Sequence, residues 1–196
     1  MIKLTKLKAA KIISTIFVPP TFTILVLPYL VFKYEYLLFQ RWAAILIGLT
    51  FGFGIQIVTY FYFLRKNKIK SFNESNNKER IIPYLFQIVF YIIGFILLLL
   101  SDSIYLIVIF WFTYILNSLA LIIINYKWKI SSHSIGVAQH FALFFYLSFP
   151  LYWLFILLAI LIGWARIELN VHDKYQIIAG LALGFILTYL QLNILL

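Results

Sequence analysis

Long apolar runs separated by short polar segments make up most of this chain. The runs are continuously apolar and do not alternate, which favours membrane-spanning helices over the strands of a membrane barrel. We therefore predict an all-α integral membrane protein that forms a single transmembrane domain over residues 1–196. The apolar runs cover about residues 12–32, 43–64, 81–100, 104–125, 133–166 and 173–195.

The run from 133 to 166 has two interpretations. Residues 137–164 could form one long helix. Alternatively, Pro150 breaks the run into a hairpin of two short spans, about 133–148 and 151–166. The hairpin gives about seven spans in total, and the single helix gives one fewer.

Proline and glycine predict local features inside two other runs. Pro19 and Pro20 interrupt the first run, so we expect a break or kink there. Gly180 and Gly184 form a G-x-x-x-G pair in the last run, which favours close packing against another helix.

The positive charges orient these spans. The chain has 16 Lys and Arg residues, and the hairpin places all of them except Lys33 and Arg41 on one face, together with a basic interfacial segment at 1–11 and a polar loop at 65–80. The single helix would move two of these cations across, so charge favours the hairpin. By the positive-inside rule the N-terminus and this face are cytoplasmic, in the cell (inner) membrane. The net charge of +10 then reflects loops, and we expect no nucleic-acid partner.

Side chains that could take part in catalysis or ligand binding cluster between residues 127 and 180. This stretch contains all three histidines, His133, His140 and His172, together with Arg166. Such groups are costly near a bilayer and mark functional sites. The hairpin brings His133, Arg166 and His172 to the same membrane surface. We expect His140, one heptad after His133, to be a packed, hydrogen-bonded core histidine.

Two motifs flank the predicted hairpin. S-S-H at 131–133 precedes it, and Arg166 follows it with R-x5-H spacing to His172. These motifs resemble P-S-G-H and S-R-x5-H-x3-D of the type 2 phosphatidic acid phosphatases, a family of membrane lipid phosphatases. The resemblance covers about residues 104–195, the phosphatase-like core, and implies that the C-terminal six helices resemble the six-helix core of that family.

The resemblance implies a role for each matching residue. His172 would be the nucleophile that forms a phosphohistidine, and His133 would protonate the leaving lipid oxygen and then assist the attack of water. Arg166 would bind the phosphate oxygens as their charge develops. Ser131 would donate a hydrogen bond to the phosphate, with Ser132 beside it.

This chain differs from the family pattern at two places that carry charge. It contains no K-x6-R-P motif, so Lys127, Lys129 or Arg80 would have to supply phosphate-binding charge. Gln176 stands where the family has its final aspartate. It lies four residues after His172 on the same helix face, so its carbonyl oxygen can contact the imidazole.

We therefore expect a metal-independent lipid phosphatase or phosphotransferase that acts on a phosphorylated phospholipid or polyprenyl lipid. Asp173 is a weaker substitute for the missing aspartate, because it points to another side of the helix. The chain has no cysteine and no carboxylate spacing that supports a three-histidine metal site, so we predict no metal and no other cofactor. The alternative function is that of an inactive descendant that binds, scaffolds or transports anionic lipid.

Overall fold

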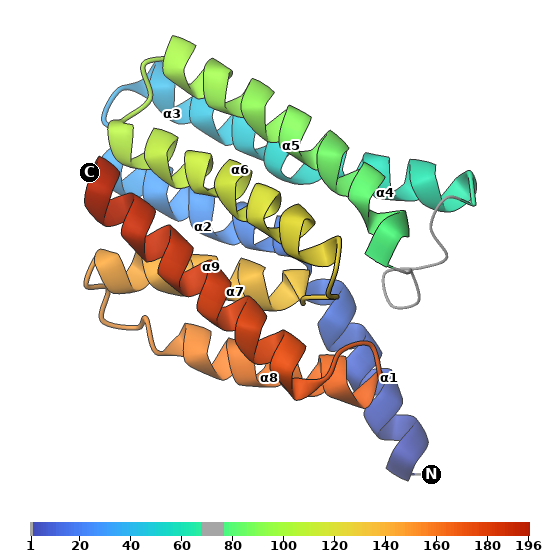
Figure 1. The fold of residues 1–196 in the computed structure, drawn as a ribbon. Helices are drawn as coiled ribbons and strands as arrows, with labels where there is room; N and C mark the ends of the chain where they lie inside the picture. The colour runs from blue at the N-terminus through green and yellow to red at the C-terminus, as the bar shows by residue number, and fades with distance from the viewer. Residues whose placement is uncertain (1, 68–76) are drawn as a thin grey trace.

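The computed structural model describes residues 2–67 and 77–196, and every regular element within them is helical (Figure 1). The helices are α1 (Ile2–Ile16), α2 (Pro19–Tyr34), α3 (Leu38–Ile47), the π-helical segment η1 (Gly48–Gly54), α4 (Ile55–Arg65), α5 (Asn77–Leu100), α6 (Tyr105–Asn125), α7 (Ser132–Tyr146), α8 (Leu154–Glu168) and α9 (Lys174–Leu195). The predicted all-α class is confirmed.

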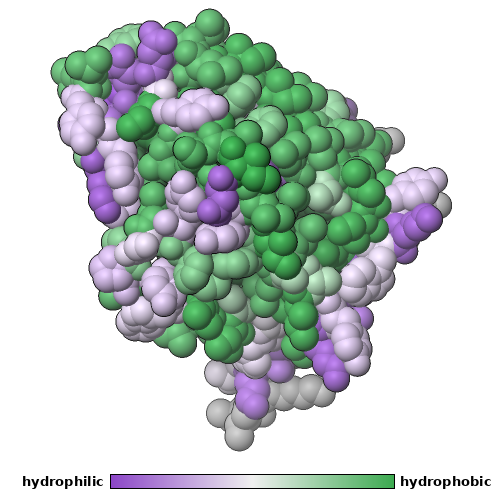
Figure 2. Space-filling view, turned by 60° about the vertical axis from the view of Figure 1, so that its left-hand side comes forward, coloured by the Kyte–Doolittle hydropathy of each residue, from purple (hydrophilic) through white to green (hydrophobic). Residues whose placement is uncertain are grey.

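Four helical stretches of the described chain are long and apolar enough to cross a membrane. They are Leu38–Arg65, which joins α3, η1 and α4, then Glu79–Leu100, Tyr105–Asn125 and Lys174–Leu195. A fifth is obtained if α1 and α2, which are bent by 51°, form one span. Figure 2 shows a broad apolar surface, with hydrophilic residues mainly over its left-hand side and toward its lower right. These features are consistent with an integral membrane protein.

The helix breaks lie close to the prolines at which they were predicted. α7 ends at Tyr146 and α8 begins at Leu154, so residues 137–164 form a hairpin around Pro150 and not one long helix. With 15 residues each, α7 and α8 rise only ~22 Å. The break in the first run lies just before Pro19, because the residue that precedes a proline is disfavoured in a helix.

The predicted polar loop 65–80 ends earlier than the sequence indicated. α5 begins at Asn77, so Arg80 belongs to the start of a helix and not to a loop. Residues 68–76 of the predicted loop lie outside the described part of the chain.

Close packing of α7 against α9 fixes the part of the fold that positions the site (Figure 1). A Cβ atom on Gly180 would come within 2.8 Å of the Ser131 carbonyl oxygen, and one on Gly184 within 2.5 Å of that of Ile135. The G-x-x-x-G pair therefore lies against the α7 backbone, as predicted. The N-terminus of α7 lies near the start of α9, where the Ser131 N–H donates to the Gln176 carbonyl oxygen at 3.4 Å. α7 also packs on α2 and α8.

Candidate functional site

The connection between α8 and α9 fixes the spacing between Arg166 and His172. α8 ends in a Schellman motif, in which Asn170 takes the left-handed conformation at φ 53°. The N–H of the following residue donates to the Arg166 carbonyl at 3.2 Å. Asp173 then caps the N-terminus of α9. Arg166 and His172 consequently lie on the two sides of one tight turn.

Gln176 orients the imidazole of His172. Oε1 of Gln176 lies 2.9 Å from Nδ1 of His172 and also accepts from the backbone N–H of Asp173 at 3.4 Å. Because an amide oxygen can only accept, Nδ1 carries the proton and Nε2 carries the lone pair. Nε2 is buried and has no hydrogen-bond partner among the described residues. The predicted contact between Gln176 and the imidazole is therefore present.

His133 lies in the first turn of α7. Ser131 caps this helix, and its hydroxyl accepts from the N–H of Ser134 at 3.3 Å. Nε2 of His133 lies 3.1 Å from the carbonyl oxygen of Ser14 and must donate to it. The lone pair is then on Nδ1, which is buried and has no partner in the described parts of the chain. Each of the two histidines thus keeps one ring nitrogen available.

Ser14 of α1 is a site residue that the sequence did not predict. Its hydroxyl accepts from Nη1 of Arg166 at 2.6 Å, while its carbonyl accepts from His133. The last carbonyls of a helix lack partners within that helix, and α1 ends at Ile16, so the Ser14 carbonyl is placed to serve this role. Ser14 and Arg166 are 152 residues apart, and no local pattern links them.

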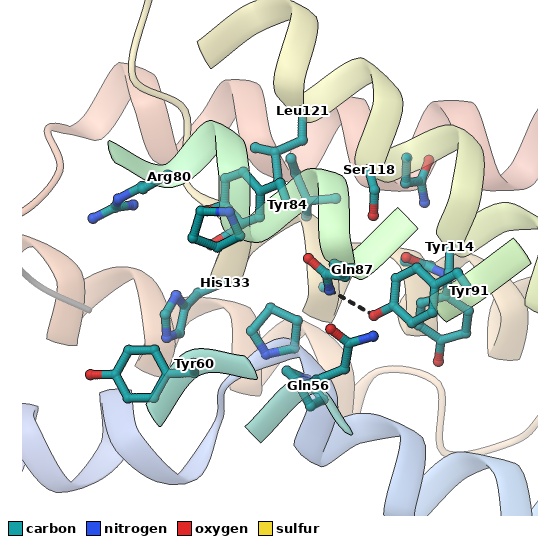
Figure 3. Close-up of a pocket in the computed structure, with 18 of the residues that line it drawn as sticks. Gln56, Tyr60, Arg80, Tyr84, Gln87, Tyr91, Tyr114, Ser118, Leu121 and His133 are labelled. Carbon is teal, nitrogen blue, oxygen red and sulfur yellow. Dashed lines mark hydrogen bonds between the residues drawn. The ribbon is translucent and has the colours of Figure 1, made fainter. Parts of the chain in front are cut away.

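Arg80 and Lys129 add positive charge to this cluster. Arg80 is buried and lines a pocket that also contains His133 (Figure 3). Burial lowers the pKa of Lys129, and the charges of Arg80 and Arg166 lower it further. Burial, and after it the charge of Arg166, lowers the pKa of His172 to about 3, despite the opposing effect of the hydrogen bond that its Nδ1 donates to Gln176. His172 is therefore neutral at pH 7.

The structure brings most of the predicted site residues together. These are His133, His172, Arg166, Arg80, Lys129, Ser131 and Gln176. Ser132 is half-buried and lines the same pocket as His133. Lys127 is exposed. Asp173 is also exposed, and it acts as a helix cap and not as a partner of the imidazole.

His140 lies deeper in the bundle and is fully engaged. The Tyr114 hydroxyl lies 2.8 Å from Nε2, and the Gly136 carbonyl oxygen lies 2.7 Å from Nδ1. The ring also stacks on Phe22 at a centroid distance of 5.0 Å. The predicted core histidine is confirmed. Among the described residues, no three His, Cys, Asp or Glu side chains form a group that could hold a metal ion.

The arrangement fits an anion with several oxygen atoms. The N-termini of α7 and α9 lie at the site, and helix N-termini present backbone N–H groups and partial positive charge. Arg166, Arg80 and Lys129 add cationic hydrogen-bond donors. Two imidazoles with available nitrogens supply the groups needed for nucleophilic and acid–base chemistry. Comparisons of the chain with protein-family models, curated proteins and solved structures find no match.

Proposed function

We propose that this protein is a metal-independent membrane phosphatase or phosphotransferase that acts on a phosphorylated lipid. The observation that carries the proposal is the state of His172. Its Nδ1 is held by Gln176, so Nε2 presents a buried lone pair beside the charge of Arg166. The resemblance of S-S-H and R-x5-H to the motifs of type 2 phosphatidic acid phosphatases supports the same function.

The first chemical step would transfer the phosphoryl group to the protein. Nε2 of His172 attacks phosphorus, the bond from phosphorus to the lipid oxygen breaks, and a protonated His133 gives its Nδ1 proton to that oxygen. The substrate dianion itself favours protonation of His133, because a negative charge beside an imidazole stabilises the imidazolium. Arg166, Arg80 and Lys129 balance the charge on the phosphoryl oxygens.

The second step would release the phosphate. A water molecule attacks the phosphohistidine, and Nδ1 of His133 takes a proton from that water while the bond between phosphorus and Nε2 breaks. Inorganic phosphate leaves, and His172 regains its lone pair. In a phosphotransferase, an alcohol takes the place of water. Both steps use the same two ring nitrogens, and neither needs a metal ion.

The same proposal includes an arrangement in the bilayer. α7 and α8 would cross as a short hairpin, which makes about seven spans. The last six, from the Leu38–Arg65 stretch to α9, would correspond to the six-helix core of the phosphatase family. Short helices span the membrane where the bilayer thins or the flanking residues snorkel. The excess of Lys and Arg at the ends that carry the site favours a cytoplasmic site, in the cell membrane. The lipid would stay anchored at the membrane while its phosphate reaches His172.

A second candidate function is binding of an anionic lipid head group without catalysis. Ser14 favours it, because α1 already places a hydroxyl on Arg166 and a carbonyl on His133. Gln176 favours it as well, since an amide stabilises an imidazolium less than a carboxylate does. A protein of this kind would bind, scaffold or transport the lipid.

Phosphate release by the purified full-length protein in detergent tests the first function. The substrates are a phosphatidic acid and a polyprenyl diphosphate, each with EDTA present. The variants are His172→Ala and, as a matched neighbour, Asp173→Asn, which keeps the helix cap. We expect release that persists in EDTA, is lost in His172→Ala and is retained in Asp173→Asn.

Two other outcomes would contradict the proposed mechanism. Release that EDTA abolishes would indicate a metal-dependent reaction and remove the phosphohistidine route. No release from either lipid by a folded protein would favour the second function. Sedimentation with phosphatidic acid vesicles, compared with phosphatidylcholine vesicles, would then show whether the site binds the head group.

A further inference from the structure

A crevice of about 120 Å³ runs from the site into the middle of the helix bundle. Residues of α2, α4, α5, α6 and α7 line it. Figure 3 shows Arg80 and His133 toward one end and Tyr91 and Tyr114 toward the other, with Tyr60 and Gln56 facing them from α4. His133 therefore belongs both to the candidate site and to the crevice.

The length of the crevice matches one leaflet of a bilayer. Its lining residues on α5 extend from Arg80 to Tyr91, which is a rise of ~16 Å along the helix. This part of α5 belongs to the apolar stretch Glu79–Leu100, which is long enough to cross a membrane. Half of the hydrocarbon core of a bilayer measures ~15 Å. The crevice thus reaches from the end of the bundle that carries the site to about mid-depth.

The inner walls suit a hydrocarbon chain. Nε2 of Gln87 donates to the Tyr91 hydroxyl at 2.7 Å, and the Tyr114 hydroxyl pairs with His140 at 2.8 Å. These polar atoms bind one another, and the amide nitrogens of Gln56, Gln139 and Asn117 donate to other groups of the protein. Most of the surface that lines the space is therefore apolar. The mouth differs, because Arg80 and His133 place a cation and an imidazole there. An occupant with an anionic head and an apolar chain complements both ends.

We propose that this crevice binds one hydrocarbon chain of a phosphorylated lipid whose phosphate lies at the Arg80 and His133 end. The proposal rests on the proposed function for the position of the phosphate. It adds a determinant of specificity, because the small volume of the crevice would limit the length of chain that the protein accepts. Occupancy of the crevice can be measured without any catalytic activity.

Photolabelling tests the occupant directly. The full-length protein is reconstituted in phosphatidylcholine vesicles with a phosphatidic acid that carries a diazirine at the middle of one chain. We expect adducts on crevice residues such as Ser118 and Leu121, competed by unlabelled phosphatidic acid and far less by the matching diacylglycerol. Adducts confined to the outer surface, as at the exposed Ile123, or equal competition by both lipids would overturn the proposal.

Filling the crevice tests its role in specificity. Ser118→Phe places a ring inside it, while Leu119→Phe adds the same ring on the exposed side of the next residue of α6. We expect Ser118→Phe to reduce crevice labelling, and hydrolysis of long-chain phosphatidic acid, by at least about tenfold, since several methylene groups lose their burial. Hydrolysis of a short-chain, water-soluble phosphatidic acid by Ser118→Phe should change less than about twofold. In Leu119→Phe, labelling and hydrolysis of both lipids should also change less than about twofold.

A second variant that fills the crevice, together with the wild type, distinguishes failure of the chain-binding proposal from failure of the phosphatase proposal. Ile57→Phe fills the crevice from the α4 side and should repeat the chain-length effect if Ser118→Phe fails to fold. Equal losses for long and short chains would contradict a chain-binding role. If the wild type hydrolyses neither lipid but its crevice is labelled, the phosphatase function fails and the chain site stands. If the wild type hydrolyses a lipid but its crevice is not labelled, the chain site fails and the phosphatase function stands.

Discussion

Two buried histidine environments in this protein differ first in the hydrogen bonds of their ring nitrogens. His140, in the middle of the bundle, has both ring nitrogens engaged by groups of the protein. His133 and His172, at one end of the bundle, each have one nitrogen engaged and one buried nitrogen without a partner in the described chain. All three rings are at most 5% exposed, so burial does not distinguish them.

The second difference is the charge around the rings. Aromatic rings surround His140, including Phe22, Phe110 and Tyr114. His172 instead lies under the influence of Arg166, Arg80 and Lys129. A buried histidine with both nitrogens hydrogen-bonded is typical of a structural role. A buried histidine with an unpartnered nitrogen beside cations is typical of a functional site, where the cations can bind an anion next to the nitrogen lone pair. The comparison therefore assigns chemistry to one end of the molecule and packing to the other.

The largest expected effect comes from removing the proposed nucleophile. We predict that His172→Ala lowers the rate of phosphate release by at least about 10⁴-fold, because the variant lacks the side chain that would form the covalent intermediate and no neighbouring group can replace it. The measurement is single-turnover phosphate release, with trapping of acid-labile phosphoprotein in the wild type. A His172→Ala protein that still forms an acid-labile phosphoprotein would place the nucleophile elsewhere.

A carboxylate at position 176 should strengthen the site. We predict that Gln176→Glu raises the rate by about 10²-fold, since a carboxylate on Nδ1 of His172 stabilises the imidazolium that an amide cannot. Glutamate is also a good residue at this place in a capping box, so α9 should still form. Gln176→Leu, which removes the acceptor, should lower the rate. Equal rates in all three proteins would show that the contact at Nδ1 does not tune the nucleophile.

The R-x5-H spacing follows from local structure that the sequence encodes. R-x5-H reflects a Schellman turn followed by a capped helix, and both are local structures with residue signatures, here Asn170 and Asp173. The break at Pro150 was predictable for the same reason. Local chemistry thus indicated the hairpin and the positions of Arg166 and His172 within it.

Contacts between distant segments were not predictable in this way. Ser14 reaches His133 across 119 residues, and its signal in the sequence is a single serine near the end of an apolar run. Arg80 was one of several candidate cations, and its burial depends on α5 starting before it, at Asn77. The number of spans also depends on packing, because α7 and α8 are too short for hydropathy alone to decide.

The pKa of His172 makes stability depend on pH. It is about 3 in the folded protein against an ordinary value of 6.5, so between these pH values the unfolded chain binds a proton that the folded chain does not. Stability should therefore fall as pH falls below about 6.5, by about 2 kcal/mol at pH 5. Thermal unfolding at pH 7 and pH 5, compared with His172→Gln, measures this. The variant should lose less stability, and equal losses would contradict the assignment.

Ser14 should act by holding Arg166. We predict that Ser14→Ala weakens phosphate binding by about tenfold, because a buried hydrogen bond to a charged group is worth about 1.5–3 kcal/mol. The effect should appear in KM more than in kcat, and Ser14→Thr, which retains the hydroxyl, should restore it. Thr15→Ala is the matched control, since Thr15 is exposed and bonds only to Lys11 in the same helix. A rise in phosphate affinity in Ser14→Ala would mean that Ser14 competes with the ligand.

The smallest expected effect on activity belongs to His140. His140→Phe keeps an aromatic ring against Phe22 but removes the partner of the Tyr114 hydroxyl, which then keeps only a long contact of 3.4 Å with Thr23. We predict a loss of about 1–3 kcal/mol in the free energy of unfolding, from a buried polar group left poorly paired. Phosphate release by the folded fraction should change less than about twofold. Thermal unfolding and phosphate release, measured on the same preparation, separate the two effects. If His140→Phe instead abolished release at unchanged stability, the mid-bundle histidine would belong to the chemistry and the division of the molecule into a reactive end and a packed centre would be wrong.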